Sequence, residues 1–132
     1  MIAVQNKPAV LEVPLYNVSE NRNKIMERLE FLDSELLGTE NEARYLETKS
    51  YLQQILDVLE YGRYPFIGVD DDGQIGAEWH DGKDYRIVSI TPVNEEKVII
   101  NCIKTSFKSV VKIQTTLENI VRNSNKELMI TI

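Results

Sequence analysis

Residues that build metal and thiol sites are scarce in this sequence. Its 132 residues include one cysteine, one histidine and one tryptophan. The single Cys102 cannot form a disulfide within the chain or a thiolate cage for a metal. Because it lies in the apolar run 98–103, we expect a small buried side chain, and a free thiol favours a reducing, cytoplasmic compartment. We expect neither a metal nor a cofactor.

Long apolar runs and phosphate-binding motifs are also lacking. No apolar run approaches the length that crosses a bilayer, and residues 1–16 have neither the basic start nor the apolar centre of a secretory signal. Neither a G-x-x-x-x-G-K-[ST] nor a G-x-G-x-x-G pattern occurs. Gly68 and Gly76 fall inside expected strands, which indicates a bulge or close packing. We therefore expect no membrane association and no phosphate-binding loop.

Positive charge is in the minority. The net charge of −6 argues against binding to nucleic acid or to an anionic membrane. Residues 19–62 hold ten acidic and five basic side chains, residues 63–82 five and one, and residues 83–132 five and eight. The chain is therefore acidic early and mildly basic late, and we expect no nucleic-acid partner.

The length predicts one domain spanning residues 1–132. A chain of this size buries roughly two-thirds of its unfolded surface, which is enough for a core without disulfides or metals. The fold that the pattern predicts is α+β. It consists of an αα-hairpin packed on a four-stranded antiparallel meander, followed by a helix and a terminal strand.

Two helices joined by a short turn are the clearest local feature. Ser19 precedes an apolar stripe at helical spacing, made of Ile25, Leu29, Leu32 and Leu36. Gly38 predicts the end of this helix, and Thr39 with Glu42 predicts a capping box that starts a second one. Gly62 is expected to end the second helix. Its inner face should comprise Tyr45, Leu52, Ile55, Leu56 and Leu59.

Strand patterns lie on both sides of the hairpin. Residues 9–15 read as an edge strand or extended lead-in, because Pro14 cannot donate a ladder hydrogen bond. After the hairpin, the turn signals Asp72-Gly73 and Asp81-Gly82 separate short β-type runs. We expect Trp79 to face the core and Glu78 the solvent, and the third strand to be central. The four expected strands are Phe66–Val69, Gln74–Trp79, Tyr85–Ile90 and Lys97–Ile103.

The last part of the chain is less clearly patterned. A turn is expected at 91–95. Residues 108–122 have apolar spacing that favours a helix, but their β-branched residues weaken that prediction and leave a strand open. In a helix, Lys104, Lys108 and Lys112 would share one face. Residues 128–132 are expected to form a terminal strand.

Three consecutive acids form the first candidate site. Asp70, Asp71 and Asp72 precede Gly73 in an arrangement similar to a calcium loop, but the twelfth position is Trp79 instead of the Glu that closes such loops. We interpret these acids as a solvated turn. Weak cation binding and a small metal-dependent enzyme remain as alternatives.

An aromatic and basic patch is the second candidate. Tyr61, Arg63 and Tyr64 belong to residue types that are enriched in protein-binding hot spots. Together with Glu78 and the three acids at the turn, they make up the partner-binding set that we predict. His80 has no second histidine or cysteine nearby, so we interpret it as an exposed residue beside a turn and assign no catalytic residue.

The segment 60–90 resembles a group of small uncharacterised bacterial and phage proteins. The shared features are Pro65-Phe66-Ile67, the Asp72-Gly73-Gln74-Ile75 turn, Glu78-Trp79 and the strand Tyr85-Arg86-Ile87. The resemblance implies a helical part followed by a β-meander. It also implies a setting in which antitoxins, immunity proteins and anti-defence proteins are common.

The function that we expect is a non-enzymatic protein-binding module. Its acidic surface would face a basic surface of a partner protein, in the manner of an antitoxin, immunity or anti-defence protein. A structural subunit of a larger assembly is the alternative, with the metal-dependent enzyme as a further one. The sequence leaves self-association open.

Overall fold

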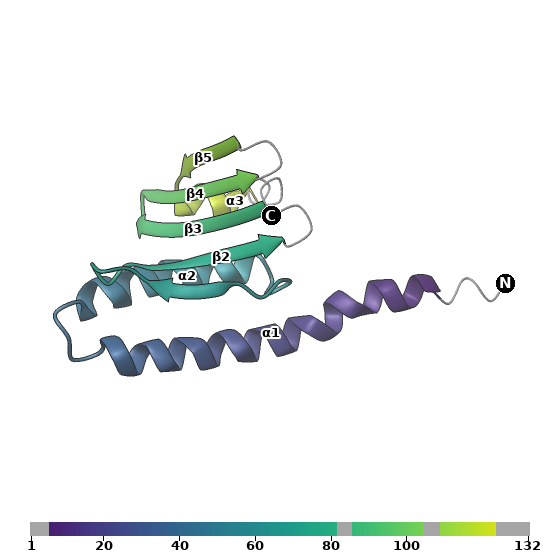
Figure 1. The fold of residues 1–132 in the computed structure, drawn as a ribbon, viewed down its shortest axis with the longest axis horizontal. Helices are drawn as coiled ribbons and strands as arrows, with labels where there is room; N and C mark the ends of the chain where they lie inside the picture. The colour runs from purple at the N-terminus through teal and green to yellow at the C-terminus, as the bar shows by residue number, and fades with distance from the viewer. Residues whose placement is uncertain (1–5, 82–85, 105–108, 124–132) are drawn as a thin grey trace.

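The computed structural model describes residues 6–81, 86–104 and 109–123 (Figure 1). Helices α1 and α2 form an antiparallel hairpin, and a five-stranded sheet and a short helix follow. This is the expected α+β architecture, with one strand more than predicted. The elements are α1 (Asn6–Leu36), α2 (Glu42–Val58), β1 (Phe66–Val69), β2 (Ile75–Asp81), β3 (Arg86–Asn94), β4 (Lys97–Lys104), β5 (Ser109–Thr115) and α3 (Leu117–Arg122).

The sheet is a simple meander in which each strand pairs with the next. Its order is β1-β2-β3-β4-β5 and every pairing is antiparallel, so β3 is central as expected. Alternate residues of β1 to β4 join the helices in one core, and Trp79, which is 3% exposed, lies in it while Glu78 is exposed. The helices therefore cover one face of the sheet. The buried sheet residues are Ile67, Ile75, Ala77, Trp79, Val88, Ile90, Val98, Ile100 and Cys102.

Helix α2 is joined to the sheet by a buried polar contact. The Thr48 hydroxyl accepts a hydrogen bond from the Ile75 backbone N–H at 3.1 Å. The same hydroxyl donates to the Arg44 carbonyl at 2.9 Å, so both of its roles are satisfied although Thr48 is fully buried. Predicted inner-face residues of α2 surround this contact, and of these only Leu59 is partly rather than fully buried.

The expectation of an edge strand at 9–15 is wrong, because these residues belong to α1. Figure 1 shows α1 extending past the sheet at its N-terminal end. Pro8 lies in the first turn of α1, where a backbone N–H has no acceptor within the helix, so proline removes no helical hydrogen bond there. Pro14 lies further along and removes one helical hydrogen bond. Each residue added to an existing helix gains a hydrogen bond, so the stable segment beyond Ser19 extends backwards through these residues.

The turn between the two helices differs in detail from a capping box. Gly38 has φ +86°, the left-handed conformation expected after a helix end. The Glu42 carboxylate accepts from the Gly38 N–H at 2.9 Å, and the Thr39 hydroxyl accepts from the Asn41 N–H and donates to the Leu36 carbonyl. Helix α2 therefore begins at Glu42 rather than directly after Thr39.

The third strand is longer than predicted. Strand β3 continues through the expected turn at 91–95 and ends at Asn94, with a register shift between Pro92 and Asn94. Pro92 is tolerated because β2 pairs only with residues 86–90 of β3. The expected second Asp-Gly turn lies partly outside the described residues, since these stop at Asp81 and resume at Arg86.

The expected helix over 108–122 is mostly a strand. Residues 109–115 form β5, which pairs with β4, and only 117–122 are helical. Val110, Val111 and Ile113 favour a strand because their branched side chains suit a pleated surface. Thr116 then accepts a hydrogen bond from the Asn119 N–H and starts α3. The expected lysine face is therefore not formed by a helix, and Lys108 and residues 128–132 lie outside the described residues.

A partly buried ion pair between Asp33 and Lys49 joins α1 to α2. Lys49 Nζ lies 2.8 Å from Asp33 Oδ1, and the Tyr45 hydroxyl donates to the same oxygen at 2.6 Å. Burial raises the pKa of Asp33, but the hydrogen bonds from Lys49 and Tyr45 and the charge of Lys49 outweigh it, so the pKa is lower than the usual 3.8. Burial, with Asp33 beside it, raises the pKa of the Tyr45 phenol. Asp33 is therefore ionised in the folded protein near neutral pH.

We expect Asp33 to stabilise the fold in a pH-dependent way. Because its folded-state pKa is lowered, its contribution is full above the unfolded value and is lost as the pH falls through the folded value. Urea unfolding of wild type and Asp33→Asn should give a difference in free energy that is constant from about pH 5 to 7 and shrinks at lower pH. The exposed Glu27→Gln variant is the control. A difference at pH 3 as large as that at pH 7 would contradict the assignment.

Candidate functional site

The acids Asp70–Asp72 belong to a hairpin turn whose three-residue loop is Asp71-Asp72-Gly73, between the bonded residues Asp70 and Gln74. The Asp70 N–H donates to the Gln74 carbonyl, and Gly73, with φ +86°, is the one left-handed residue of the loop. Asp72-Gly73 lies at a turn as expected, but not in the two-residue type with two positive φ values that is typical of Asp-Gly, since Asp72 has no positive φ. Asp70 Oδ1 accepts from the backbone N–H groups of Asp72 and Gln74, at 2.9 Å each. The Asp70 carboxylate thus holds the loop, whereas Asp71 and Asp72 are exposed.

This loop is docked on the start of α2. The Asn41 side chain donates to the Asp71 carbonyl at 3.3 Å. A Cβ atom at Gly73 would lie 2.6 Å from Asn41 Cβ and 2.9 Å from its carbonyl oxygen, so only glycine fits there. The acidic loop therefore rests on the helical hairpin and does not project freely from the molecule.

The junction after α2 holds Tyr61 in a left-handed conformation. Glu60 and Tyr61 have φ values of +57° and +54°, whereas the expected terminator Gly62 has no positive φ. The Tyr61 hydroxyl donates to Asp57 at 2.6 Å, and its carbonyl accepts from Asn21 at 3.2 Å. Burial, with the Asp57 bond and charge, raises the pKa of Tyr61 to about 12. These contacts offset the cost of the unusual backbone.

The rest of the junction packs along α1. The Trp79 indole donates to the Arg63 carbonyl at 3.3 Å, which fixes the junction to the core. Lys24 Nζ lies 5.8 Å from the Tyr64 ring centre, and the Arg22 guanidinium lies 5.4 Å from that of Tyr61. Tyr61 and Tyr64 therefore contribute to packing within the chain, although Tyr64 remains 47% exposed.

Arg28 closes the β1 edge of the sheet. Its Nε donates to the Ile67 carbonyl at 2.9 Å, and its guanidinium lies 5.7 Å from the Phe66 ring centre and 5.2 Å from that of Phe31. An edge carbonyl that would otherwise be open to another strand is thus occupied by a side chain of α1. Nothing in the sequence pattern of α1 indicated this role.

The sheet face opposite the helices is not covered by any described element, and we call it the open face. Its residues form rows across the strands because every pairing is antiparallel. One row is largely apolar and a second is largely polar. The first runs His80, Ile87, Ile103, Val110, and the second runs Phe66, Glu78, Ser89, Asn101, Lys112.

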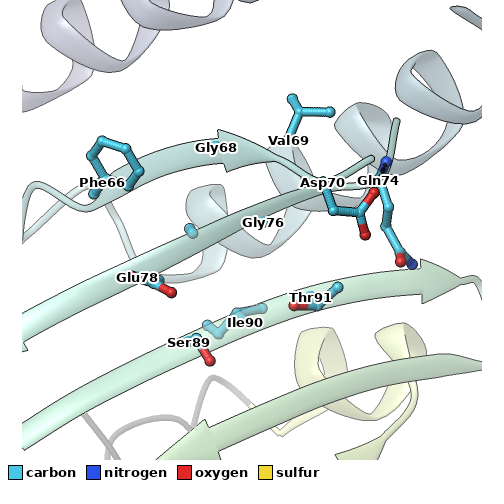
Figure 2. A pocket seen from close by; sticks show the side chains of 11 residues that line it. Phe66, Gly68, Val69, Asp70, Gln74, Gly76, Glu78, Ser89, Ile90 and Thr91 are labelled. Carbon is cyan, nitrogen blue, oxygen red and sulfur yellow. Dashed lines mark hydrogen bonds between the residues drawn. The ribbon is translucent and has the colours of Figure 1, made fainter. Parts of the chain in front are cut away.

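A hollow interrupts the open face where two glycines stand opposite each other. Gly68 of β1 pairs with Gly76 of β2, and a cavity of about 270 Å³ lies over them. Figure 2 shows the pair between Phe66 and Glu78 on one side and Asp70 and Gln74 on the other. We call this cavity the glycine trough. Of the predicted site residues, the structure brings Asp70 and Glu78 to it.

The remaining predicted residues are spread over different surfaces. Asp71 and Asp72 are exposed at the hairpin loop, Tyr61 and Tyr64 lie along α1, and the Arg63 carbonyl is bonded to Trp79. Glu78 Oε2 lies 3.2 Å from His80 Nε2. Sequence reasoning noted both glycines but not that they face each other, because their pairing depends on register.

Within residues 6–81, 86–104 and 109–123, no three His, Cys, Asp or Glu side chains lie together as a bound metal would require. Among the same residues, no helix combines the length and the apolar character needed to cross a bilayer.

Comparisons of the chain with protein-family models, with curated proteins and with solved structures found no match. We therefore argue function from the geometry of the open face and of the acidic loop. That geometry offers a broad surface for docking, with exposed apolar side chains, carboxylates and one hollow.

The free energies of unfolding of two glycine variants test whether the acidic loop is docked on α2. Gly73 and Gly38 both have φ +86°, but no atom lies within 4 Å of a Cβ placed at Gly38. Gly38→Ala should cost about 1–2 kcal/mol, from backbone strain alone. Gly73→Ala should cost about 3 kcal/mol or more, because the contact with Asn41 adds to the strain. Equal losses in urea unfolding would show that the loop is not seated on α2.

Proposed function

We propose that the chain is a protein-binding module that acts by docking a partner on its open face. The observation that carries this proposal is the position of its exposed apolar side chains. Val110 and Phe66 are large hydrophobic side chains that are 66% and 62% exposed. Both lie on the open face, one on each edge strand, and Ile103 beside Val110 is 40% exposed. Val110, Ile103 and Ile87 are neighbours across β5, β4 and β3. A contiguous row of apolar side chains on an uncovered face is typical of interaction sites.

The acidic side chains near the open face favour a partner with a basic surface. Glu78 lies on the open face. Asp70, Asp71 and Asp72 lie at the edge of the same face, where β1 ends. A partner with a basic surface would meet these acids, and charge attraction would raise its association rate. The bacterial or phage role that we favour is that of an antitoxin, immunity or anti-defence protein, each of which works by binding another protein. Assembly into a larger complex is the second candidate, since it would use the same face.

Site-specific photo-crosslinking tests which face binds. A photoreactive residue at Val110 samples the open face, and one at Glu30 samples the exposed side of α1. In host lysate, we expect a partner to crosslink through position 110 and not through position 30. Val110→Asp should reduce that partner's affinity by about tenfold or more without lowering the melting temperature, because the side chain is already exposed. Crosslinks through position 30 alone would refute the proposal.

Charge reversal tests the role of the acidic loop. Asp71→Lys with Asp72→Lys leaves Asp70, which holds the loop, unchanged. With a basic partner, the double variant should associate more slowly, and its rate should depend less on salt, because exposed charges act mainly on encounter. Glu27→Lys with Glu30→Lys on α1 is the matched control. Association rates that are equal for wild type and both variants at low salt would show that the loop does not steer the partner.

A further inference from the structure

The floor of the glycine trough is made of backbone. Gly68 and Gly76 are direct partners in the β1–β2 ladder, and glycine has no side chain to place on the open face. A Cβ at Gly68 would lie 3.4 Å from the Phe66 ring, an ordinary contact, so the space above it is free for another group. A Cβ at Gly76 would lie 3.2 Å from the Ile90 carbonyl. The cavity of about 270 Å³ above these residues thus depends on both positions being glycine.

A pair of residues bounds the trough at each of its two ends along the strand direction. Phe66 pairs with Glu78 at one end, and Asp70 bonds to Gln74 at the other. Since these pairs are four residues apart, the ends are about 13–14 Å from each other. Ser89 and Thr91 of β3 line the long side (Figure 2). The space is therefore long and narrow.

The lining carries charge of only one sign. Of the residues that the structure describes, Glu78 and Asp70 are the ionisable ones in this lining, and no described Lys or Arg belongs to it. Asp70 Oδ1 already accepts hydrogen bonds from two backbone N–H groups. Glu78 accepts none from the described backbone, and its Oε2 lies 3.2 Å from His80 Nε2, so Glu78 is the carboxylate that a ligand would bind. Phe66 stands directly across from Glu78 and is largely exposed. The Arg28 guanidinium already lies 5.7 Å from the centre of the Phe66 ring, so Glu78 is the group of the trough that would attract a cation.

We propose that the glycine trough binds an arginine side chain of the partner protein. The aliphatic stem would lie on the glycine floor, and the guanidinium would pair with Glu78 beside the Phe66 ring. The Ser89 and Thr91 hydroxyls would accept further N–H donors. Arginine fits better than lysine because its planar head can bond a carboxylate in a bidentate manner. This inference rests on the proposed function, of which it specifies one contact.

Titration of the isolated chain with short peptides tests the site directly. The peptides are acetyl-Gly-Arg-Gly-amide, its citrulline analogue, which has the same shape without the charge, and its lysine analogue. In ¹⁵N–¹H spectra, the Arg peptide should shift the amide signals of Gly68 and Gly76. We expect a dissociation constant in the millimolar range, at least about tenfold weaker binding of citrulline, and intermediate binding of lysine.

Two variants separate the parts of the site. Gly68→Ala occupies the floor, and Glu78→Gln removes the charge at nearly constant shape; each should weaken binding of the Arg peptide at least about fivefold. Gly62→Ala is the matched control, because a Cβ there lies 3.7 Å from the Leu59 carbonyl and outside the trough. The spectra of the variants also report whether each is folded.

Two results would overturn the inference. One is the absence of shifts at Gly68 and Gly76 with about 10 mM Arg peptide. The other is equal binding of the arginine and citrulline peptides. Either result would leave crosslinking through Val110 unaffected, so failure of the arginine site is distinguishable from failure of the proposed function. If crosslinking through Val110 were lost while the Arg peptide still bound, the proposed function would fail and the arginine site would stand.

Discussion

The contact between α2 and the start of β2 determines how the rest of the sheet is placed. The Thr48 hydroxyl accepts a hydrogen bond from the Ile75 N–H, and Asn41, seven residues earlier at the start of α2, lies against Gly73. Because side chains alternate along a strand, fixing one residue of β2 decides the facing of every other. A slip of one residue would expose Trp79 and bury Glu78. The open face and its trough follow from this one contact, since each later strand takes its register from the preceding one.

Much of the fold could be predicted from local pattern. The apolar stripes of the helical hairpin, the left-handed Gly38, the strand Phe66–Val69 and the inward Trp79 are all encoded within a few residues of where they act. Such features need no knowledge of distant partners. The burial of Cys102 was predicted for the same reason, from the apolar run around it.

The errors arose where a distant partner decides the local structure. Residues 109–115 have apolar spacing that fits a helix or a strand, and pairing with β4 selects the strand. Residues 9–15 were expected to form an edge strand or an extended lead-in, yet the helix predicted to begin further along the chain extends through them. The candidate site shows the same limit. Arg28 on the Ile67 carbonyl and Gly68 opposite Gly76 join residues that only the folded chain brings together.

The two edges of the sheet are unlike, and this limits how copies of the chain can associate. Strand β1 is four residues long, follows Pro65, and has the Ile67 carbonyl occupied by Arg28. Strand β5 is seven residues long and is the other edge of the described sheet. If two chains joined through β5, both outer edges of the joint sheet would be β1. Strand addition would therefore stop at a closed two-fold pair and could not continue into a fibre.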